Sequence, residues 1–445
     1  MTVNIFIHIG PPKTGTSAIQ YCLQNDRARL AENGIFYPKH TTDVNGVSSG
    51  NLNAIYDKVD NERTLNPDKV LRLISQCEAL NMHTLVLSSE FFFERLNDIF
   101  NLLPNARFIA YVRNPLESFE SLYNQSVKRH GNTKLINVRP TLPRFYLVKL
   151  EQLIEQLPAD QFILRAYGSS GFEGGTIITD FYDILGLTPP VNISNKINPS
   201  YSFEALEFKR WINLFCSTGA ASRADKILQA YVSTQQQFSL LDAATFERYK
   251  LQAHEFLAQF CKSHDVNKAD SLLDDALTCS PQPYCEQKLT LEQFVTVADY
   301  INEKDAVLYK ELCRSLYLVS YLPCFKSDFG QYLLKDYQLS EVSKQNMFKQ
   351  FIGYIRQKLG KQSQSTLTVN EHADVGRLRN QLSISDDFSD ADLLREVAIF
   401  AETNRDFGLA YALMTRAQEL RPSGSLIRAK IKYYENKIDN LKQSD

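Results

Sequence analysis

The sequence predicts an α/β fold, in which a parallel sheet covered by helices on both faces is followed by a helical C-terminal region. Over the first two hundred residues, short apolar runs alternate with segments whose apolar residues recur at helical spacing. The connections are long enough to cross over between parallel strands, and this alternation is typical of sheets with helices on both faces. Ligands of such sheets bind at the carboxyl ends of the strands, so the residues that follow each strand are candidates for a site.

The elements of the sheet can be assigned along the chain. The first strand is expected in "NIFIHI" (residues 4–9), before a glycine-rich loop and a helix whose apolar face includes Ile19 and Leu23. Asn114 and Pro115 open another helix, as a cap residue followed by a proline in the first turn. Further strands are expected in "TLVLSSE" (84–90), "ARFIAYVR" (106–113) and "QFILRAY" (161–167), and helices in "NPDKVLRLISQCEAL" (66–80), "FFFERLNDIFNLL" (91–103) and "TIITDFYDILG" (176–186).

Three regions are expected along the chain. Residues 1–330 combine the α/β core (1–200) with a helical extension (201–330) in which no further strand is expected. Residues 331–390 are expected to form a helix and a polar linker, and residues 391–445 a helical tail. A helix pair of the tail resembles one tetratricopeptide-type repeat, although arrays of this kind need about three repeats. A helical hairpin that packs on its own protein is the alternative.

Composition and charge exclude several classes of protein. Lys plus Arg number 49 against 51 for Asp plus Glu, so a chain-wide nucleic-acid or anionic-membrane surface is not expected. The eight cysteines are scattered and are expected to be reduced, although Cys279 and Cys285, the two closest in sequence, could bridge. No apolar run approaches the roughly 20 residues that span a bilayer, and the N-terminus has the pattern of a strand. A cytoplasmic protein without a transmembrane segment is therefore expected.

The loop "GPPKTGTS" (residues 10–17) has the glycine spacing of a phosphate-binding loop but a displaced lysine. In the nucleotide-binding form the lysine follows the second glycine. Here Thr16 takes that place, and Lys13 lies inside the loop. A glycine-rich turn between a strand and a helix presents backbone N–H groups to an anion, and the hydroxyls of Thr14, Thr16 and Ser17 add donors. The loop predicts a phosphate site that is poorly built for a triphosphate, with a tight strand–helix turn as the alternative.

A second anion site is expected at the end of "ARFIAYVR". Arg113 ends this strand, and Ser121 lies eight residues later on the following helix. The guanidinium is a forked, always-charged donor, and together with the serine hydroxyl it can hold a phosphate. An arginine that faces solvent at a helix start is the alternative, but the loop at another strand end favours the anion site.

The two segments together resemble the paired signature of sulfotransferases that use 3′-phosphoadenosine 5′-phosphosulfate (PAPS), bacterial members in particular. The resemblance rests on "PKTGTS" and "RNPLESFES" and covers roughly residues 3–200. It implies a P-loop-like fold in which the first motif holds the 5′-phosphosulfate and the second holds the 3′-phosphate, with no metal required. The donor site that it implies comprises Pro12, Lys13, Thr14, Gly15, Thr16 and Ser17 at the phosphosulfate, and Arg113 and Ser121 at the 3′-phosphate.

The resemblance also bears on the rest of the donor site. Tyr167, at the end of "FILRAY", resembles the family position that contacts the adenine, with an ordinary strand-end aromatic as the alternative. The family often completes the site with a late Arg-Lys-Gly-type loop, which this sequence lacks. The segment "NKINPSYS" (residues 195–202) is the candidate replacement, with Lys196, Asn198 and Ser200 as contacts.

Sulfuryl transfer requires a cation at the leaving phosphate oxygen and a base at the acceptor hydroxyl. Lys13 is the expected cation. Glu90, which closes "TLVLSSE", is the expected general base, and it resembles the glutamate base of sulfotransferases that act on glycans and proteins. A carboxylate that caps the next helix is the alternative. Other candidate bases are His8, His40 and His130, and Gln125 and Lys128 are candidates to face the acceptor.

The expected function is transfer of a sulfuryl group from PAPS to an acceptor hydroxyl of a carbohydrate or glycolipid, with Glu90 and Lys13 as catalytic residues. A P-loop kinase for a small molecule is one alternative, which Thr16 and the Arg113–Ser121 pair disfavour. A non-catalytic sulfotransferase-like scaffold, whose helical tail binds a partner protein, is the other. Retention of the loop lysine, Arg113 and Glu90 disfavours the scaffold.

Overall fold

The computed structural model describes most of the chain, in two compact units. The described residues are 3–41, 48–59, 62–190, 200–233, 236–319, 327–335, 337, 389–403 and 407–442. The first unit comprises Met1–Tyr123, Ile136–Ser200 and Gln237–Glu286, and the second comprises Asn124–Leu135, Tyr201–Gln236 and Gln287–Asp445. Lys196, Asn198 and residues 338–388 of the predicted linker lie outside the described residues. The predicted division of the chain at residues 330 and 390 stays a prediction.

The first unit is built on a six-stranded sheet in the order β2-β5-β1-β6-β7-β8. The strands are β1 (Asn4–His8), β2 (Ile35–Phe36), β5 (Thr84–Ser88), β6 (Arg107–Arg113), β7 (Phe162–Tyr167) and β8 (Val266–Asn267). Every neighbouring pair is parallel. A separate antiparallel hairpin pairs β3 (Tyr56–Val59) with β4 (Glu62–Leu65). The predicted α/β class with a parallel sheet is confirmed.

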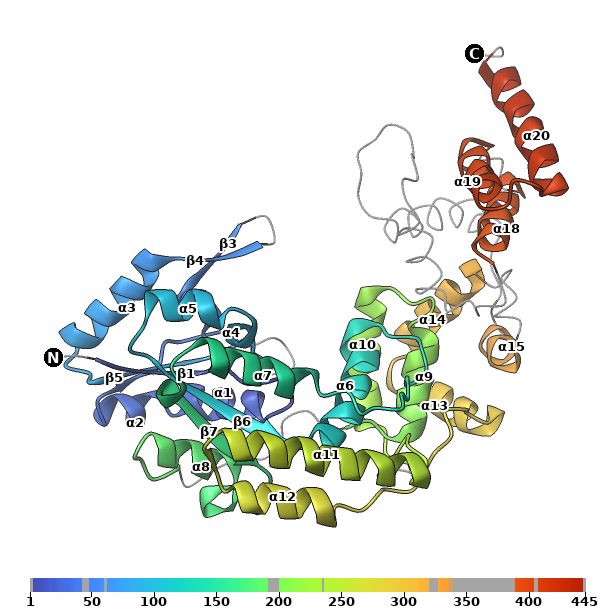
Figure 1. The fold of residues 1–445 in the computed structure, drawn as a ribbon. Helices are drawn as coiled ribbons and strands as arrows, with labels where there is room; N and C mark the ends of the chain where they lie inside the picture. The colour runs from blue at the N-terminus through green and yellow to red at the C-terminus, as the bar shows by residue number, and fades with distance from the viewer. Residues whose placement is uncertain are drawn as a thin grey trace. The chain divides into compact units, whose positions relative to one another are not determined.

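Helices cover both faces of this sheet (Figure 1), because side chains of its strands alternate between two apolar cores. In β6, Phe108, Ala110 and Val112 face one core, and Ile109 and Tyr111 face the other. The first core is completed by α3 (Pro67–Ala79), α4 (Phe91–Glu94), α5 (Leu96–Leu102), α7 (Phe145–Gln156), α11 (Ala243–Ser263) and α12 (Ala269–Thr278). The second is completed by α1 (Thr16–Asn25), α2 (Arg27–Glu32) and α8 (Ile177–Ile184).

Two expectations about individual elements are wrong. No strand was expected after residue 200, but β8 pairs with β7 through Val266 and Asn267. A two-residue strand is too short to carry a recognisable pattern. The single helix expected over residues 91–103 is two helices, because Arg95 has a ψ of 21° between α4 and α5. Neither glycine nor proline marks this break, so the local sequence gives no signal for it.

The helices of the second unit begin with α6 (Pro115–His130), which both units share. Its other helices are α9 (Phe203–Ile212), α10 (Thr218–Ala230), α13 (Leu291–Lys304), α14 (Ala306–Val319), α15 (Asp328–Leu334), α18 (Asp390–Thr403), α19 (Phe407–Leu420) and α20 (Ser425–Lys442). Cys279 and Cys285 of the first unit are not joined by a disulfide. In the described ranges, no helix combines the length and the apolar character that crossing a membrane requires.

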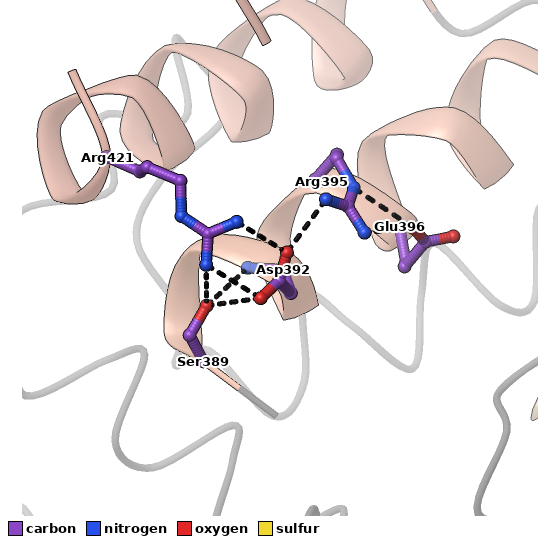
Figure 2. Close-up of polar contacts among 5 residues, drawn as sticks. All are labelled: Ser389, Asp392, Arg395, Glu396 and Arg421. Carbon is purple, nitrogen blue, oxygen red and sulfur yellow. Dashed lines mark hydrogen bonds and ion pairs between the residues drawn. The ribbon is translucent and has the colours of Figure 1, made fainter. Parts of the chain in front are cut away.

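The helices of the tail are held by a polar cluster at the start of α18 (Figure 2). The guanidinium of Arg421 donates to both carboxylate oxygens of Asp392 (2.8 Å each) and to the Ser389 hydroxyl (2.6 Å). Arg395 donates to the same carboxylate at 2.7 Å. Hydrogen bonding from Arg421 lowers the pKa of Asp392 to about 2. The cluster joins the start of α18 to the residue that follows α19.

We expect Asp392→Asn to lower the free energy of local unfolding of the α18–α19 pair by about 1 kcal/mol, which is the upper range for partly exposed ion pairs. Because folding lowers the pKa of Asp392, its stabilisation is present above the ordinary carboxyl pKa of 3.8 and is lost as the pH falls towards about 2. Hydrogen exchange of α18 and α19 amides in the full chain checks this. Glu419→Gln, which removes an ion pair within α19 only, is the control. Equal protection of the Asp392→Asn variant and the original protein at neutral pH would contradict the prediction.

Candidate active site at the strand ends

The candidate residues lie at the carboxyl ends of four adjacent strands. The loop of residues 10–17 follows β1, Glu90 follows β5, and Arg113 and Tyr167 end β6 and β7. In the sheet order these strands are neighbours, with β1 between β5 and β6. Parallel strands present their carboxyl ends at one edge, which is where ligands of such sheets bind.

The loop turns sharply through three residues in the left-handed backbone region. These are Gly10 (φ 63°), Lys13 (φ 71°) and Gly15 (φ 73°). A lysine in this region is strained and persists only where its surroundings hold it there. The Thr14 hydroxyl donates to the Pro11 carbonyl at 2.6 Å, so it closes the loop. Helix α1 starts at Thr16, and the amides of its first residues have no acceptor within the helix, so they can serve an anion.

Arg113 joins the loop to the next strand end. Its Nη1 donates to the Lys13 carbonyl oxygen at 2.5 Å, and its Nε donates to Glu117 at 3.1 Å. The first bond fixes the strained residue of the loop from a position one hundred residues later in the chain. Since a guanidinium has five N–H donors, these two bonds leave donors for a ligand.

Tyr167 lies beneath this arginine. The two residues are partners in the β6–β7 register, and the Arg113 guanidinium carbon lies 4.7 Å from the centroid of the Tyr167 ring. The edge of Phe172 approaches the same tyrosine, with the ring centroids 5.4 Å apart. One face of the predicted adenine contact is therefore occupied by the arginine.

Glu90 lies beside the loop and is partly buried. A Cβ added to Gly10 would lie 3.3 Å from the Glu90 Cγ and 3.0 Å from the Thr16 Oγ1. Burial raises the pKa of Glu90, while the charge of Lys13 and the Thr16 hydroxyl lower it in part. Glu90 occupies the N-cap position of α4, but its side chain accepts no capping hydrogen bond. This observation disfavours the interpretation of Glu90 as a helix cap.

Ser121 and the residues after it lie on α6. Ser121 is half-buried and shares a helix face with Glu117, the residue that holds Arg113, because the two are four positions apart. Gln125, Lys128 and His130 belong to the part of α6 assigned to the second unit, where the Lys128 ammonium lies 5.0 Å from the Tyr201 ring centroid. Ser200 of the candidate late loop is exposed.

The histidine candidates have structural partners. His8 is fully buried among Tyr111 and Phe181, its Nδ1 lies 2.9 Å from the Ser88 Oγ, and burial lowers its pKa to about 3. His40 is buried with its Nδ1 2.6 Å from the Ser48 Oγ, and burial lowers its pKa. Neither histidine contacts Glu90 in the hydrogen bonds described.

A segment that the sequence analysis did not identify crosses the end of β5 just before Glu90. The Asn51 side chain accepts from the Ser88 amide at 2.8 Å, and the Ser89 hydroxyl donates to the Ser49 carbonyl at 2.7 Å. Gln20, one turn after Thr16 on α1, donates to the Ser88 carbonyl at 3.3 Å. Gly50 has a φ of 71°, a backbone region that favours glycine, so a glycine at this turn is the signal in the sequence that could have indicated the segment.

We expect Gly50→Ala to destabilise the protein by at least about 2 kcal/mol. An alanine Cβ would lie 1.7 Å from the Ser88 carbonyl oxygen, in addition to the strain of the positive φ. Gly186→Ala is the matched control, because it has a φ of 69° and nothing within 4 Å of the added Cβ. Thermal unfolding of both variants measures the difference, and equal midpoints would contradict the close approach.

Neither a metal-binding cluster among the described residues nor a similar protein indicates the function of this site. In the part of the chain that the structure describes, no group of three or more His, Cys, Asp or Glu side chains is arranged to hold a metal ion. No protein-family model, curated protein or solved structure matches this chain.

Proposed function

We propose that this protein is a sulfotransferase that moves a sulfuryl group from PAPS to the hydroxyl of a carbohydrate or glycolipid. The observation that carries the proposal is the hydrogen bond from Arg113 to the Lys13 carbonyl. It joins the two elements that resemble the paired donor motifs of these enzymes, and each element offers donors to an anion. The P-loop-like assignment of residues 10–17 belongs to the same proposal.

In the proposed donor site, the phosphosulfate lies on the loop. Pro12 and Thr14 shape the turn, Gly15 permits its positive φ, and the amides of Thr16 and Ser17 at the start of α1 donate to the phosphate. The Thr16 hydroxyl is buried and has no hydrogen-bond partner at normal distance among the described residues, although it lies close enough to lower the pKa of Glu90. A ligand oxygen would satisfy it.

The 3′-phosphate lies on Arg113 and Ser121 in this proposal. A phosphate of PAPS would take the guanidinium donors that Glu117 and the loop carbonyl do not use. Tyr167 holds the guanidinium from below and contacts the adenine from its remaining surface. The hydrogen-bond donors of these residues support the assignments. Binding of adenosine 3′,5′-bisphosphate, the product of the transfer, tests them without the reaction itself.

The transfer step forms a bond from the acceptor oxygen to sulfur and breaks the bond from sulfur to the bridging phosphate oxygen. The acceptor hydroxyl gives its proton to the Glu90 carboxylate. The electron pair of the broken bond goes to the phosphate, where the Lys13 ammonium stabilises the developing charge. Burial raises the pKa of Glu90, which makes it a stronger base than an exposed carboxylate, while the charge of Lys13 lowers this pKa in part.

A transfer assay tests the proposal. PAPS labelled in its sulfate is incubated with the full chain and a panel of glycans and glycolipids, and ATP labelled in its γ-phosphate is run in parallel. We expect label to move from PAPS only. Transfer from ATP alone would favour the kinase, and no transfer from either donor, with PAPS bound, would favour the scaffold.

A further inference from the structure

The second unit contains a cleft of about 840 Å³ formed by α13, α14 and α15. Its volume lies in the range of small-molecule sites. Tyrosines and basic residues dominate its lining, and those that matter here are Tyr309, Lys310, Arg314, Tyr332, Lys335 and Tyr337. All of them belong to a different unit from the candidate active site.

Two of the three tyrosines, Tyr332 and Tyr337, contact neighbouring side chains. The Tyr332 hydroxyl donates to Asp299 at 2.5 Å, and the Lys335 ammonium lies 3.9 Å from the Tyr332 ring centroid. Tyr337 packs against Tyr317 with ring centroids 5.7 Å apart. Ordered aromatic faces attract the weakly positive C–H groups of a sugar ring as well as cations.

The lining of the cleft has a net positive charge, because it contains Lys310, Arg314 and Lys335 against Asp299 and Glu311. Glu311 also pairs with Arg223 at 2.8 Å. Lys310 and Arg314 are four positions apart on one face of α14, and both are exposed. A lysine and an arginine so placed suit sulfate or carboxylate groups, to which arginine can donate in a bidentate manner.

We propose that this cleft binds an anionic oligosaccharide, with sugar rings on the tyrosines and sulfate or carboxylate groups on Lys310 and Arg314. This binding does not depend on the proposed sulfotransferase function. A saccharide is the proposed occupant because the lining combines tyrosine rings, which can pack against sugar rings, with basic side chains, which can pair with sulfate or carboxylate groups.

Calorimetry on the full chain tests the cleft with sulfated maltohexaose and with maltohexaose itself. We expect the sulfated sugar to bind at least tenfold more tightly than the neutral one. The double variant Lys310→Ala/Arg314→Ala should lose at least tenfold of that affinity, and Tyr332→Ala should weaken it as well. The control is Lys226→Ala/Arg248→Ala, which removes an exposed lysine and arginine from α10 and α11 and should change nothing.

The proposal would be overturned by original affinity in the Lys310→Ala/Arg314→Ala variant, by equal losses in the control variant, or by equal binding of the two sugars. Displacement of the sulfated sugar by adenosine 3′,5′-bisphosphate would also overturn it, since the cleft would then be a nucleotide site. The nucleotide should bind the double variant as it binds the original protein. If it binds neither protein, the proposed function fails while the sugar result still decides the cleft.

Discussion

Replacing Glu90 by glutamine should lower sulfuryl transfer by at least about 100-fold, the lower range for loss of a general base. Glutamine keeps the shape of the side chain but cannot take the acceptor proton. Since it does not remove a donor contact, the affinity for adenosine 3′,5′-bisphosphate should change less than twofold. A labelled-sulfate assay and calorimetry measure the two quantities on the same preparation.

The same variant should be more stable than the original protein at neutral pH. Burial raises the pKa of Glu90 above its ordinary value of 4.5, so ionisation of this carboxyl opposes folding. The stabilisation from the protonated carboxyl is fully present below the ordinary pKa and is lost as the pH rises through the folded pKa. Glutamine imitates the protonated form, so its advantage in melting temperature should be present at pH 7 and absent below about pH 4.

Glu94→Gln is the matched control for both measurements, because Glu94 is an exposed carboxylate in the next turn of the chain. It should alter neither transfer nor the pH dependence of stability. Original turnover in the Glu90→Gln variant would remove Glu90 as the base. A lower melting temperature at neutral pH would contradict the raised pKa.

Arg113→Ala should weaken adenosine 3′,5′-bisphosphate binding at least tenfold, or about 1.4 kcal/mol. The variant loses the charged donors of the proposed 3′-phosphate site and also the hydrogen bond that holds the Lys13 carbonyl. Adenosine 5′-phosphate, which lacks the 3′-phosphate, separates the two effects. The affinity for adenosine 5′-phosphate should fall only to the extent that the loop of residues 10–17 becomes less ordered.

Arg107→Ala is the control, because Arg107 lies at the opposite end of the same strand and is exposed. A loss below twofold for Arg113→Ala would contradict the 3′-phosphate assignment. If ATP raises the melting temperature of the original protein more than adenosine 3′,5′-bisphosphate does, the alternative function as a P-loop kinase is favoured.

The sequence identified the four strands that carry the site, and the signal is clearest in β5 and β6, which are buried on both faces. Continuous apolar runs such as "FIAYV" are visible without any knowledge of their partners. It could not identify β8, whose two residues form a strand only because β7 offers an unpaired edge. The break at Arg95 is hidden for a similar reason, since packing of the two short helices against the core decides it.

The candidate site divides in the same way. Lys13, Arg113 and Glu90 could be proposed from the sequence because each follows a strand whose carboxyl end is predictable. The sequence also determined that the loop lysine is displaced from its usual place in nucleotide-binding loops. The near balance of 49 basic and 51 acidic residues argues against a basic surface over the whole chain.

Only the tertiary structure decided which contacts these residues make and how far they are buried. The hydrogen bond from Arg113 to the Lys13 carbonyl and the approach of Gly50 to the Ser88 carbonyl both join segments that are far apart in the chain. The raised pKa of Glu90 depends on its burial beside the loop. Strand patterns are local and can be seen in the sequence, whereas hydrogen-bond partners and solvation are set by segments far apart in the chain.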